Sequence, residues 1–175
     1  MPELIAPTAR LHTAWIEAHD EWGPGLHEDG FGLAPSDEVD SPSGFAAWVT
    51  RLAEEEEEDR GKPVGAGRTA RVYRWIVERD RVLGGIALRN ELSDYVMQFG
   101  HIGYGVRPSA RRRGLGTWAL GRMLDEARAL GLDRVLLVCA ADNRASVRTM
   151  EQQGGVFESV RDTEHGPVRR YWIKL

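Results

Sequence analysis

Apolar side chains recur at helical spacing in the first sixty residues. A short apolar stretch at 3–8 predicts a first strand, and Thr8 then has the position of a helix N-cap before apolar residues at Leu11, Ala14, Trp15, Ala18 and Trp22. A second stripe follows Ser41 and Pro42, a capping serine with proline in the first helical position, at Phe45, Trp48, Val49 and Leu52. The pattern therefore predicts two amphipathic helices joined by a long loop over residues 23–40.

From about residue 71 the pattern changes to that of strands. Val72–Glu78 and Val82–Leu88 are rich in strand-forming residues and are separated by the polar turn Arg79-Asp80-Arg81. A polar and aromatic connection follows at 89–100. The next strand, His101–Val106, ends before Pro108, which has no N–H to donate to a ladder. We therefore expect three successive strands with antiparallel neighbours.

The last third of the chain predicts a strand–helix–strand crossover and a closing hairpin. A helix over about 118–130 ends at Gly131, in the position of a C-terminal glycine. Val135–Ala140 is a continuous apolar run, which indicates burial on both faces, as in a parallel pairing. A further helix and the two strands of the hairpin follow at Asn143–Gln153, Val156–Val160 and Val168–Ile173.

The order of elements is thus β-α-α-β-β-β-α-β-α-β-β, in a single domain over residues 1–175. This order predicts a mixed α/β (α+β) fold with a central mixed, mostly antiparallel sheet flanked by helices. It excludes a doubly wound nucleotide-binding fold, in which strands and helices alternate throughout.

Composition narrows the classes of function. A lone cysteine, Cys139, excludes a disulfide scaffold and suits a reducing compartment. No apolar run reaches the roughly 18 residues of a membrane span, and the first residues lack the pattern of a secretory signal. A cytoplasmic protein is therefore expected, with no membrane partner. The net charge of −4 argues against nucleic-acid binding.

The segment after the strand His101–Val106 carries the chemistry. Pro108 turns the chain, three arginines follow, and Gly114-Leu115-Gly116 leads into a helix. A glycine-rich turn at a helix N-terminus exposes backbone N–H groups at the positive end of the helix dipole, and glycines let a diphosphate approach closely. The segment therefore predicts a pyrophosphate site.

Two glycine motifs fit this segment. Gly114–Ala119 reads G-x-G-x-x-A, a dinucleotide fingerprint, but that motif belongs in a first βαβ unit with an acidic residue about 20 positions later, and here Asp142 comes late. The other motif is R-x-x-G-x-G, at Arg111, Gly114 and Gly116, after a strand that ends V-x-P. This spacing resembles the signature of the GNAT acyl-CoA-dependent N-acetyltransferases.

Further motifs carry the same resemblance, and together they span about residues 82–173. Asn143-Arg144-Ala145-Ser146 follows the next strand like the asparagine and small residue that open the family's next helix, and Glu151–Phe157 resembles its helix-ending E-x-x-G-F. Within the GNAT superfamily, the strings GHIGYGVRPSARRRGLGTWAL and VLLVCAADNRASV resemble an uncharacterised bacterial subgroup of acetyltransferases.

The resemblance implies an acetyl-CoA site and no metal. Acetyl-CoA, the acyl donor, would lie where His101–Val106 splays from the strand Arg134–Ala140. Asn143 and Ser146 would touch the pantetheine arm from one side, and backbone groups of Tyr104, Gly105 and Val106 would pair with it from the other. The amides that would hold the pyrophosphate are those of Arg111, Arg112, Arg113, Gly114, Leu115, Gly116 and Thr117.

The catalytic residues are less sharply indicated. Many GNATs place a tyrosine seven residues after the motif asparagine to protonate the leaving thiolate, but that position is Met150 here, so Ser146 is a candidate substitute. Glu91 and His101 are candidate general bases for an amine. The structural alternatives are a solvated turn residue for Glu91 and a hydrogen-bonded strand-end histidine for His101.

The acceptor is expected to be the primary amine of a small molecule or peptide, attacked directly in a ternary complex. By family analogy its pocket comes from the loop 23–40 and the connection 89–100. Acidic side chains there would attract a cation, whereas Arg89 and Asn90 would bind a carboxylate. A homodimer is compatible with the resemblance. The alternative function is a non-catalytic acyl-CoA-binding module.

Overall fold

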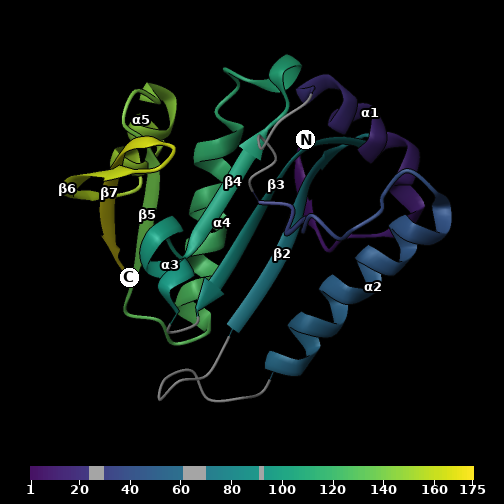
Figure 1. The fold of residues 1–175 in the computed structure, drawn as a ribbon, viewed down its shortest axis with the longest axis horizontal. Coiled ribbons are helices and arrows are strands. Elements are labelled where there is room, and N and C mark those ends of the chain that lie inside the picture. The colour runs from purple at the N-terminus through teal and green to yellow at the C-terminus, as the bar shows by residue number, and fades with distance from the viewer. Residues whose placement is uncertain (24–29, 61–69, 91–92) are drawn as a thin grey trace.

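The computed structural model describes residues 1–23, 30–60, 70–90 and 93–175, and its ribbon is shown in Figure 1. The elements, in chain order, are β1 (Glu3–Ile5), the 3₁₀ turn η1 (Ala9–Leu11), α1 (His12–Trp22), α2 (Pro42–Asp59), β2 (Ala70–Glu78), β3 (Arg81–Asn90), α3 (Asp94–Phe99), β4 (Ile102–Val106), the 3₁₀ turn η2 (Pro108–Ala110), α4 (Leu115–Ala129), β5 (Arg134–Ala140), α5 (Arg144–Gln152), β6 (Val156–Thr163) and β7 (Gly166–Lys174).

The strands form two sheets. One has the order β1-β2-β3-β4 and the other β5-β7-β6, and every ladder among the described residues is antiparallel. The mixed α/β class, mostly antiparallel with flanking helices, is therefore confirmed. Because β4 and β5 end their respective sheets, each presents an edge that no strand of the described chain completes.

The predicted parallel pairing of Val135–Ala140 is wrong. This segment is β5, which pairs antiparallel with β7, so that Leu137 lies opposite Tyr171. Burial on both faces is nevertheless observed, because the successive residues Val135, Leu136 and Leu137 are fully buried. A run of apolar residues reports that both faces are covered, but it does not report the direction of the neighbouring strand.

A short helix, α3, interrupts the connection that was expected at 89–100. The side chain of Ser93 caps it by accepting a hydrogen bond from the amide of Val96 at 3.3 Å. Among its six residues only Val96 is buried. The helix packs on β5, so it covers part of the second sheet directly before the chain enters β4.

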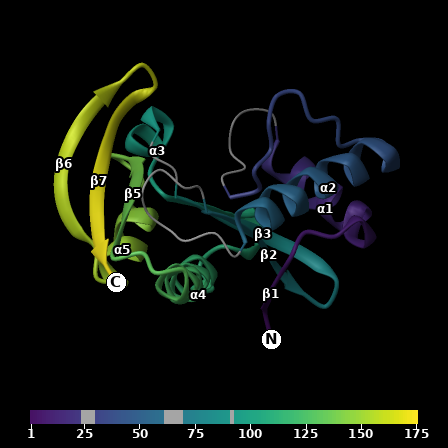
Figure 2. The same cartoon turned by 90° about the horizontal axis from the view of Figure 1, so that it is seen from below.

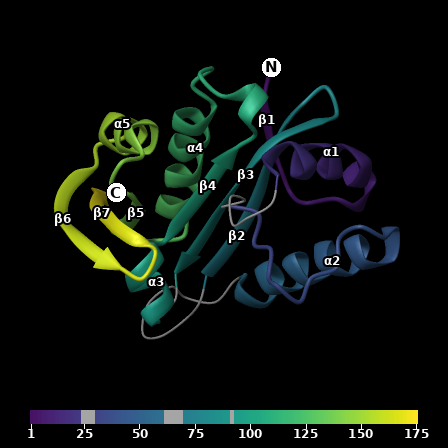
Figure 3. The ribbon, with the colours of Figure 1, turned by 45° about the horizontal axis from the view of Figure 1, so that its top comes forward.

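Two hydrophobic cores lie on opposite faces of the four-stranded sheet. On one face, α1 and α2 pack an aromatic cluster that includes Trp15, Trp48 and Trp75. On the other face, α4 packs a core that continues onto β5, β7 and α5. Figure 2 shows α4 on one side of the sheet and α1 and α2 on the other. The α4 core therefore joins the two sheets, and Figure 3 shows α5 beside α4.

Candidate functional site

The turn between β4 and α4 is anchored by a buried arginine. Arg107 is 3% exposed, and its guanidinium donates to Glu21 at 2.6 Å and to Glu17 at 3.1 Å, both on α1. Glu21 also accepts from the amide of Ser109 at 2.5 Å. Burial acts to raise the pKa of Glu21, but the hydrogen bonds from Ser109 and Arg107 outweigh it and leave the pKa below its ordinary value. The first helix thus fixes the start of the turn.

Backbone amides collect at the end of this turn. Arg112 and Gly114 both have left-handed φ angles, of 64° and 75°, and Gly114 is the N-cap of α4 without a side-chain cap. The amide of Arg111 donates to the carbonyl of Pro108 at 3.3 Å, and the helical ladder begins with Trp118 donating to Gly114 at 2.9 Å. Between them, the amides of residues 112–117 have no acceptor within the described chain. Six donors at the N-terminus of a 15-residue helix make an anion site.

Space for a ligand lies beside these donors. A Cβ atom built on Gly114 meets no atom within 4 Å, and one built on Gly116 meets only the Tyr104 ring, at 3.6 Å. Residues 111–114 are exposed. The turn therefore has both the donors and the room that a diphosphate needs.

The three arginines of the turn have different surroundings. Nε of Arg111 donates to the carbonyl of Val106 at 2.9 Å and so holds the end of β4. Arg113 forms a two-pronged ion pair with Glu78, at 3.0 and 3.1 Å, which lowers the pKa of that carboxyl. No hydrogen bond or ion pair joins the side chain of Arg112 to another described residue. Two of the three guanidiniums therefore shape the turn.

The edges of β4 and β5 touch at one end. The amide of His101 donates to the carbonyl of Leu136 at 2.7 Å, the amide of Leu136 donates to Nδ1 of His101 at 2.8 Å, and Gly100 forms an isolated bridge with Leu137. No ladder continues from there between β4 and β5 within the described residues. An extended ligand can therefore meet strand edges on both sides.

The side chain of His101 takes part in this contact between β4 and β5. Burial is the largest influence on its ring and lowers the pKa, against an opposing contribution from the backbone of Leu136. Since Nδ1 accepts the hydrogen bond from the Leu136 amide, the neutral ring carries its proton on Nε2. Neither nitrogen then has a free lone pair for a substrate proton, so the geometry favours the strand-end alternative over the general base.

The other predicted catalytic residues are placed as follows. Glu91 lies outside the described residues. Ser146 is partly buried in the first turn of α5, where its amide donates to Oδ1 of the capping residue Asn143 at 3.1 Å. The start of α4 is tied to this helix, because Thr117 and Thr149 share a hydrogen bond of 3.2 Å. Asn143 and Ser146 thus belong to the helix that borders the amide cluster.

Two residues on this side are shielded from solvent. Met150, in the position of the family's tyrosine, is 2% exposed and packs in the α4 core. Cys139 is 8% exposed, and burial raises the pKa of its thiol to about 11. Such a thiol is not a nucleophile at neutral pH.

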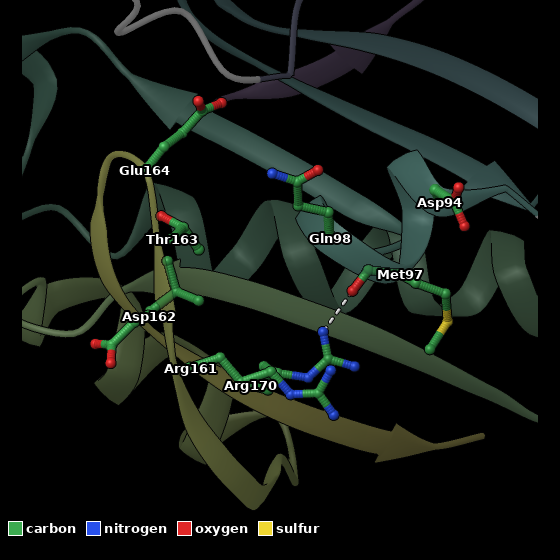
Figure 4. Close-up of a pocket in the computed structure, with 9 residues that line it drawn as sticks. Asp94, Met97, Gln98, Arg161, Asp162, Thr163, Glu164 and Arg170 are labelled. Carbon is green, nitrogen blue, oxygen red and sulfur yellow. Dashed lines mark hydrogen bonds between the residues drawn. The ribbon is translucent and has the colours of Figure 1, made fainter.

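The side opposite α4 contains groups that the sequence did not single out. Arg89, a candidate carboxylate ligand, stacks over the ring of Tyr95 on α3, with its guanidinium carbon 4.5 Å from the ring centroid. A cavity lies between α3 and the β6–β7 hairpin, against the buried Arg170 (Figure 4). Nothing in the residue pattern of β7 indicated that this arginine is buried.

Neither a metal-ligand cluster nor a membrane-spanning helix is found in the described residues. No three His, Cys, Asp or Glu side chains among them come together as a metal site. No helix in the described part of the chain is long and apolar enough to cross a bilayer.

Two antiparallel sheets joined by a helix core, with a glycine turn at the helix N-terminus, define the acetyltransferase type of α/β fold. The family described as acetyltransferase (GNAT) domain matches residues 34–156, and the chain belongs to this family. A comparison with curated protein sequences finds no match.

Solved structures share the fold at low sequence identity. A ribosomal-protein-S5-alanine acetyltransferase from Vibrio fischeri has a TM-score of 0.75 at 13% identity, over 99% of this chain and 92% of that one. The ribosomal L7/L12 alpha-N-protein acetyltransferase RimL, in complex with coenzyme A, has a TM-score of 0.72 at 16% identity, over 99% and 94%. The microcin C7 self-immunity acetyltransferase MccE, in complex with acetyl-CoA and AMP, has a TM-score of 0.69 at 14% identity, over 99% and 92%.

Proposed function

We propose that this chain is an acetyl-CoA-dependent N-acetyltransferase that transfers an acetyl group to a primary amine by direct attack in a ternary complex. The observation that carries the proposal is the cluster of unpaired amides at residues 112–117 beside the open edges of β4 and β5. Membership of the GNAT family supports it, as do structural relatives that hold coenzyme A or acetyl-CoA.

The chain's own residues divide the binding work. The amides of 112–117 hold the diphosphate, and the edge groups of Tyr104, Gly105 and Val106 hold the pantetheine arm. Asn143 and Ser146, at the start of α5, border the arm from the β5 side. Acetyl-CoA supplies, when bound, a thioester carbonyl that an amine can attack.

Two requirements of the reaction fall on the protein. An alkyl amine with a pKa of about 10.4 is almost fully protonated at neutral pH, so its proton must pass to a base or to water. A backbone N–H of β4 polarises the carbonyl as the N–C bond forms and the C–S bond breaks, with the electron pair leaving on sulfur. Because Met150 has no proton to give, the thiolate leaves as the anion or takes its proton from solvent.

The test is an acceptor screen that follows release of free coenzyme A thiol. The proposal predicts that some amine accelerates release, that Gly116→Trp abolishes the acceleration by filling the diphosphate space, and that Ala129→Trp preserves it. Ala129 is the matched control because it is exposed at the far end of the same helix. Binding of coenzyme A without turnover on a broad amine panel would favour the non-catalytic module instead.

A further inference from the structure

A cavity of about 460 Å³ lies between α3 and the tip of the β6–β7 hairpin. Figures 2 and 3 both show that tip beside α3. Figure 4 shows lining side chains from both elements, and the charged or polar ones include Asp94, Gln98, Arg161, Asp162, Glu164 and Arg170. Cations and acids are mixed in this lining, so the cavity offers complements to both charges of a zwitterion.

Arg170 is the buried group of the cavity. It is 2% exposed; its Nε donates to Glu158 at 2.6 Å, and its Nη1 donates to the carbonyl of Met97. Nη2 is shielded from solvent and has no hydrogen-bond partner within the described chain. A buried donor without an acceptor is costly, and few native proteins keep one without a reason. Because Arg170 lines the cavity, a ligand bound there can supply the missing acceptor.

The carboxylate that pairs with Arg170 is shared with a second guanidinium. Glu158 is shared by two guanidiniums, Arg170 at 2.6 Å and Arg161 at 3.7 Å. Its second oxygen accepts from the indole of Trp172 at 3.1 Å. One carboxylate thus faces two cations, and it leaves Nη2 of the Arg170 guanidinium fork to bind a further carboxylate. Asp162 lines the same wall, so the hairpin as a whole carries both charges. On the rim, Asp94 and Glu164 provide negative charge.

The cavity adjoins the gap between the sheets on the side opposite α4. Tyr171 and Ile173 of β7 face the α4 core. Because successive side chains of a strand point to opposite faces, Arg170 faces away from that core, on the same face as Val168. Arg170 pairs with Val138 of β5, one strand spacing of about 5 Å from the strand whose open edge faces β4. The other wall, α3, leads through Gly100 directly into β4.

We propose that this cavity binds the carboxylate of a zwitterionic acceptor, such as a free amino acid. Nη2 of Arg170 donates to the carboxylate, and the acids Asp94 and Glu164 attract the ammonium group on its way to the thioester. This inference rests on the proposed function and names its acceptor class. It predicts that the substrate carries its carboxylate and its primary amine on one small molecule.

The first experiment needs no variant. Calorimetry on the protein saturated with coenzyme A, which has no acetyl group to transfer, measures binding of amino acids and of the matching amino-acid amides. The inference predicts at least one pair in which the acid binds about tenfold or more tightly than its amide, the effect of a charge-assisted hydrogen bond. Equal binding within every pair, or no binding of any carboxylate, overturns it. An amine that is acetylated equally well as acid and amide keeps the proposed function and overturns this inference. Tight binding of the acid without turnover keeps this inference and overturns the proposed function.

The second experiment assigns the contact. Arg170→Met should bring the affinity for the acid down to that for its amide, while the affinity for coenzyme A stays unchanged and circular dichroism reports the fold. Arg170→Lys keeps the charge without the planar fork, and it should lose several-fold affinity; it replaces the methionine variant if that one does not fold. Arg122→Met, on an exposed face of α4, is the control for loss of one cation and should bind as the wild type. Unchanged discrimination between acid and amide in both Arg170 variants overturns the assignment.

Discussion

Glu21 is the residue by which α1 holds the turn after β4. Its carboxylate accepts from Arg107 at 2.6 Å and from the amide and hydroxyl of Ser109 at 2.5 and 3.0 Å. Because Arg107 is 3% exposed, Glu21→Gln leaves a buried cation with a weakened partner. We expect this change to destabilise the fold and to loosen the turn that presents the amides of 112–117.

The size of the effect follows from burial on each side of the pair. Breaking a fully buried ion pair costs about 3–5 kcal/mol. The side chain of Glu21 is 24% exposed, and Glu17 still reaches Arg107 at 3.1 Å. These two facts reduce the expected loss to about 2 kcal/mol. For a chain of this length the melting temperature should fall by about 4–8 °C.

Glu17→Gln is the matched control. Glu17 contacts the same arginine, but it is 60% exposed, so its removal should cost no more than about 1 kcal/mol. Calorimetric unfolding at pH 7 compares the two variants. Because the folded-state pKa of Glu21 is lowered, its contribution is present above the unfolded-state pKa and is lost as the pH falls through the folded-state value. The difference between wild type and Glu21→Gln should therefore shrink in acid. Equal melting temperatures for the two variants at pH 7 would refute the anchoring role of Glu21.

Three further outcomes are expected. The thiol of Cys139, with its pKa raised to about 11 by burial, should resist iodoacetamide at pH 8 in the folded protein, and rapid labelling would contradict its burial. NMR titration of Glu158 should give a midpoint near 2, because the indole of Trp172 and then Arg170 hydrogen-bond the carboxylate; Arg170→Met should raise that midpoint, and an unchanged value would count against the contact. Gly114→Ala places a side chain at φ 75° with no clash, so thermal unfolding should show a loss of about 1–2 kcal/mol from backbone strain alone, and an unchanged melting temperature would argue against the left-handed cap.

Helix starts were predictable because their signals are local. Ser41 accepts from the amide of Gly44 at 3.0 Å, as its place before Pro42 predicted. The turn at Arg79 and Asp80 has φ angles of 50° and 59°, which suit the twist of a two-residue hairpin. Each of these features depends on residues within three or four positions.

The helix α3 was not predictable in the same way. Its apolar residues Tyr95, Met97 and Phe99 alternate along the sequence and are all exposed, so they show no helical stripe. A single residue, Val96, is buried, and the segment is held by packing on β5. Such a contact depends on the tertiary fold, and a six-residue helix has little stability of its own.

In the candidate site, too, the local features were predictable and the contacts between distant residues were not. The glycine turn and the helix start are local, and their pattern predicted where the unpaired amides would lie. The partners of the charged residues are distant: Arg113 meets Glu78 35 positions away, and Arg107 meets Glu21 86 positions away. The sequence therefore pointed to the cluster of arginines, but it did not reveal which of them shape the turn.

The most direct test of the account follows the individual amides. Titration of the isotope-labelled protein with coenzyme A, monitored by two-dimensional amide NMR, should shift the resonances of residues 112–117 more than those of the rest of α4. Pantetheine, which lacks the diphosphate, should leave these six amides nearly unmoved while it perturbs β4. Binding of coenzyme A that leaves the amides of 112–117 in place would contradict the claim that they hold the diphosphate.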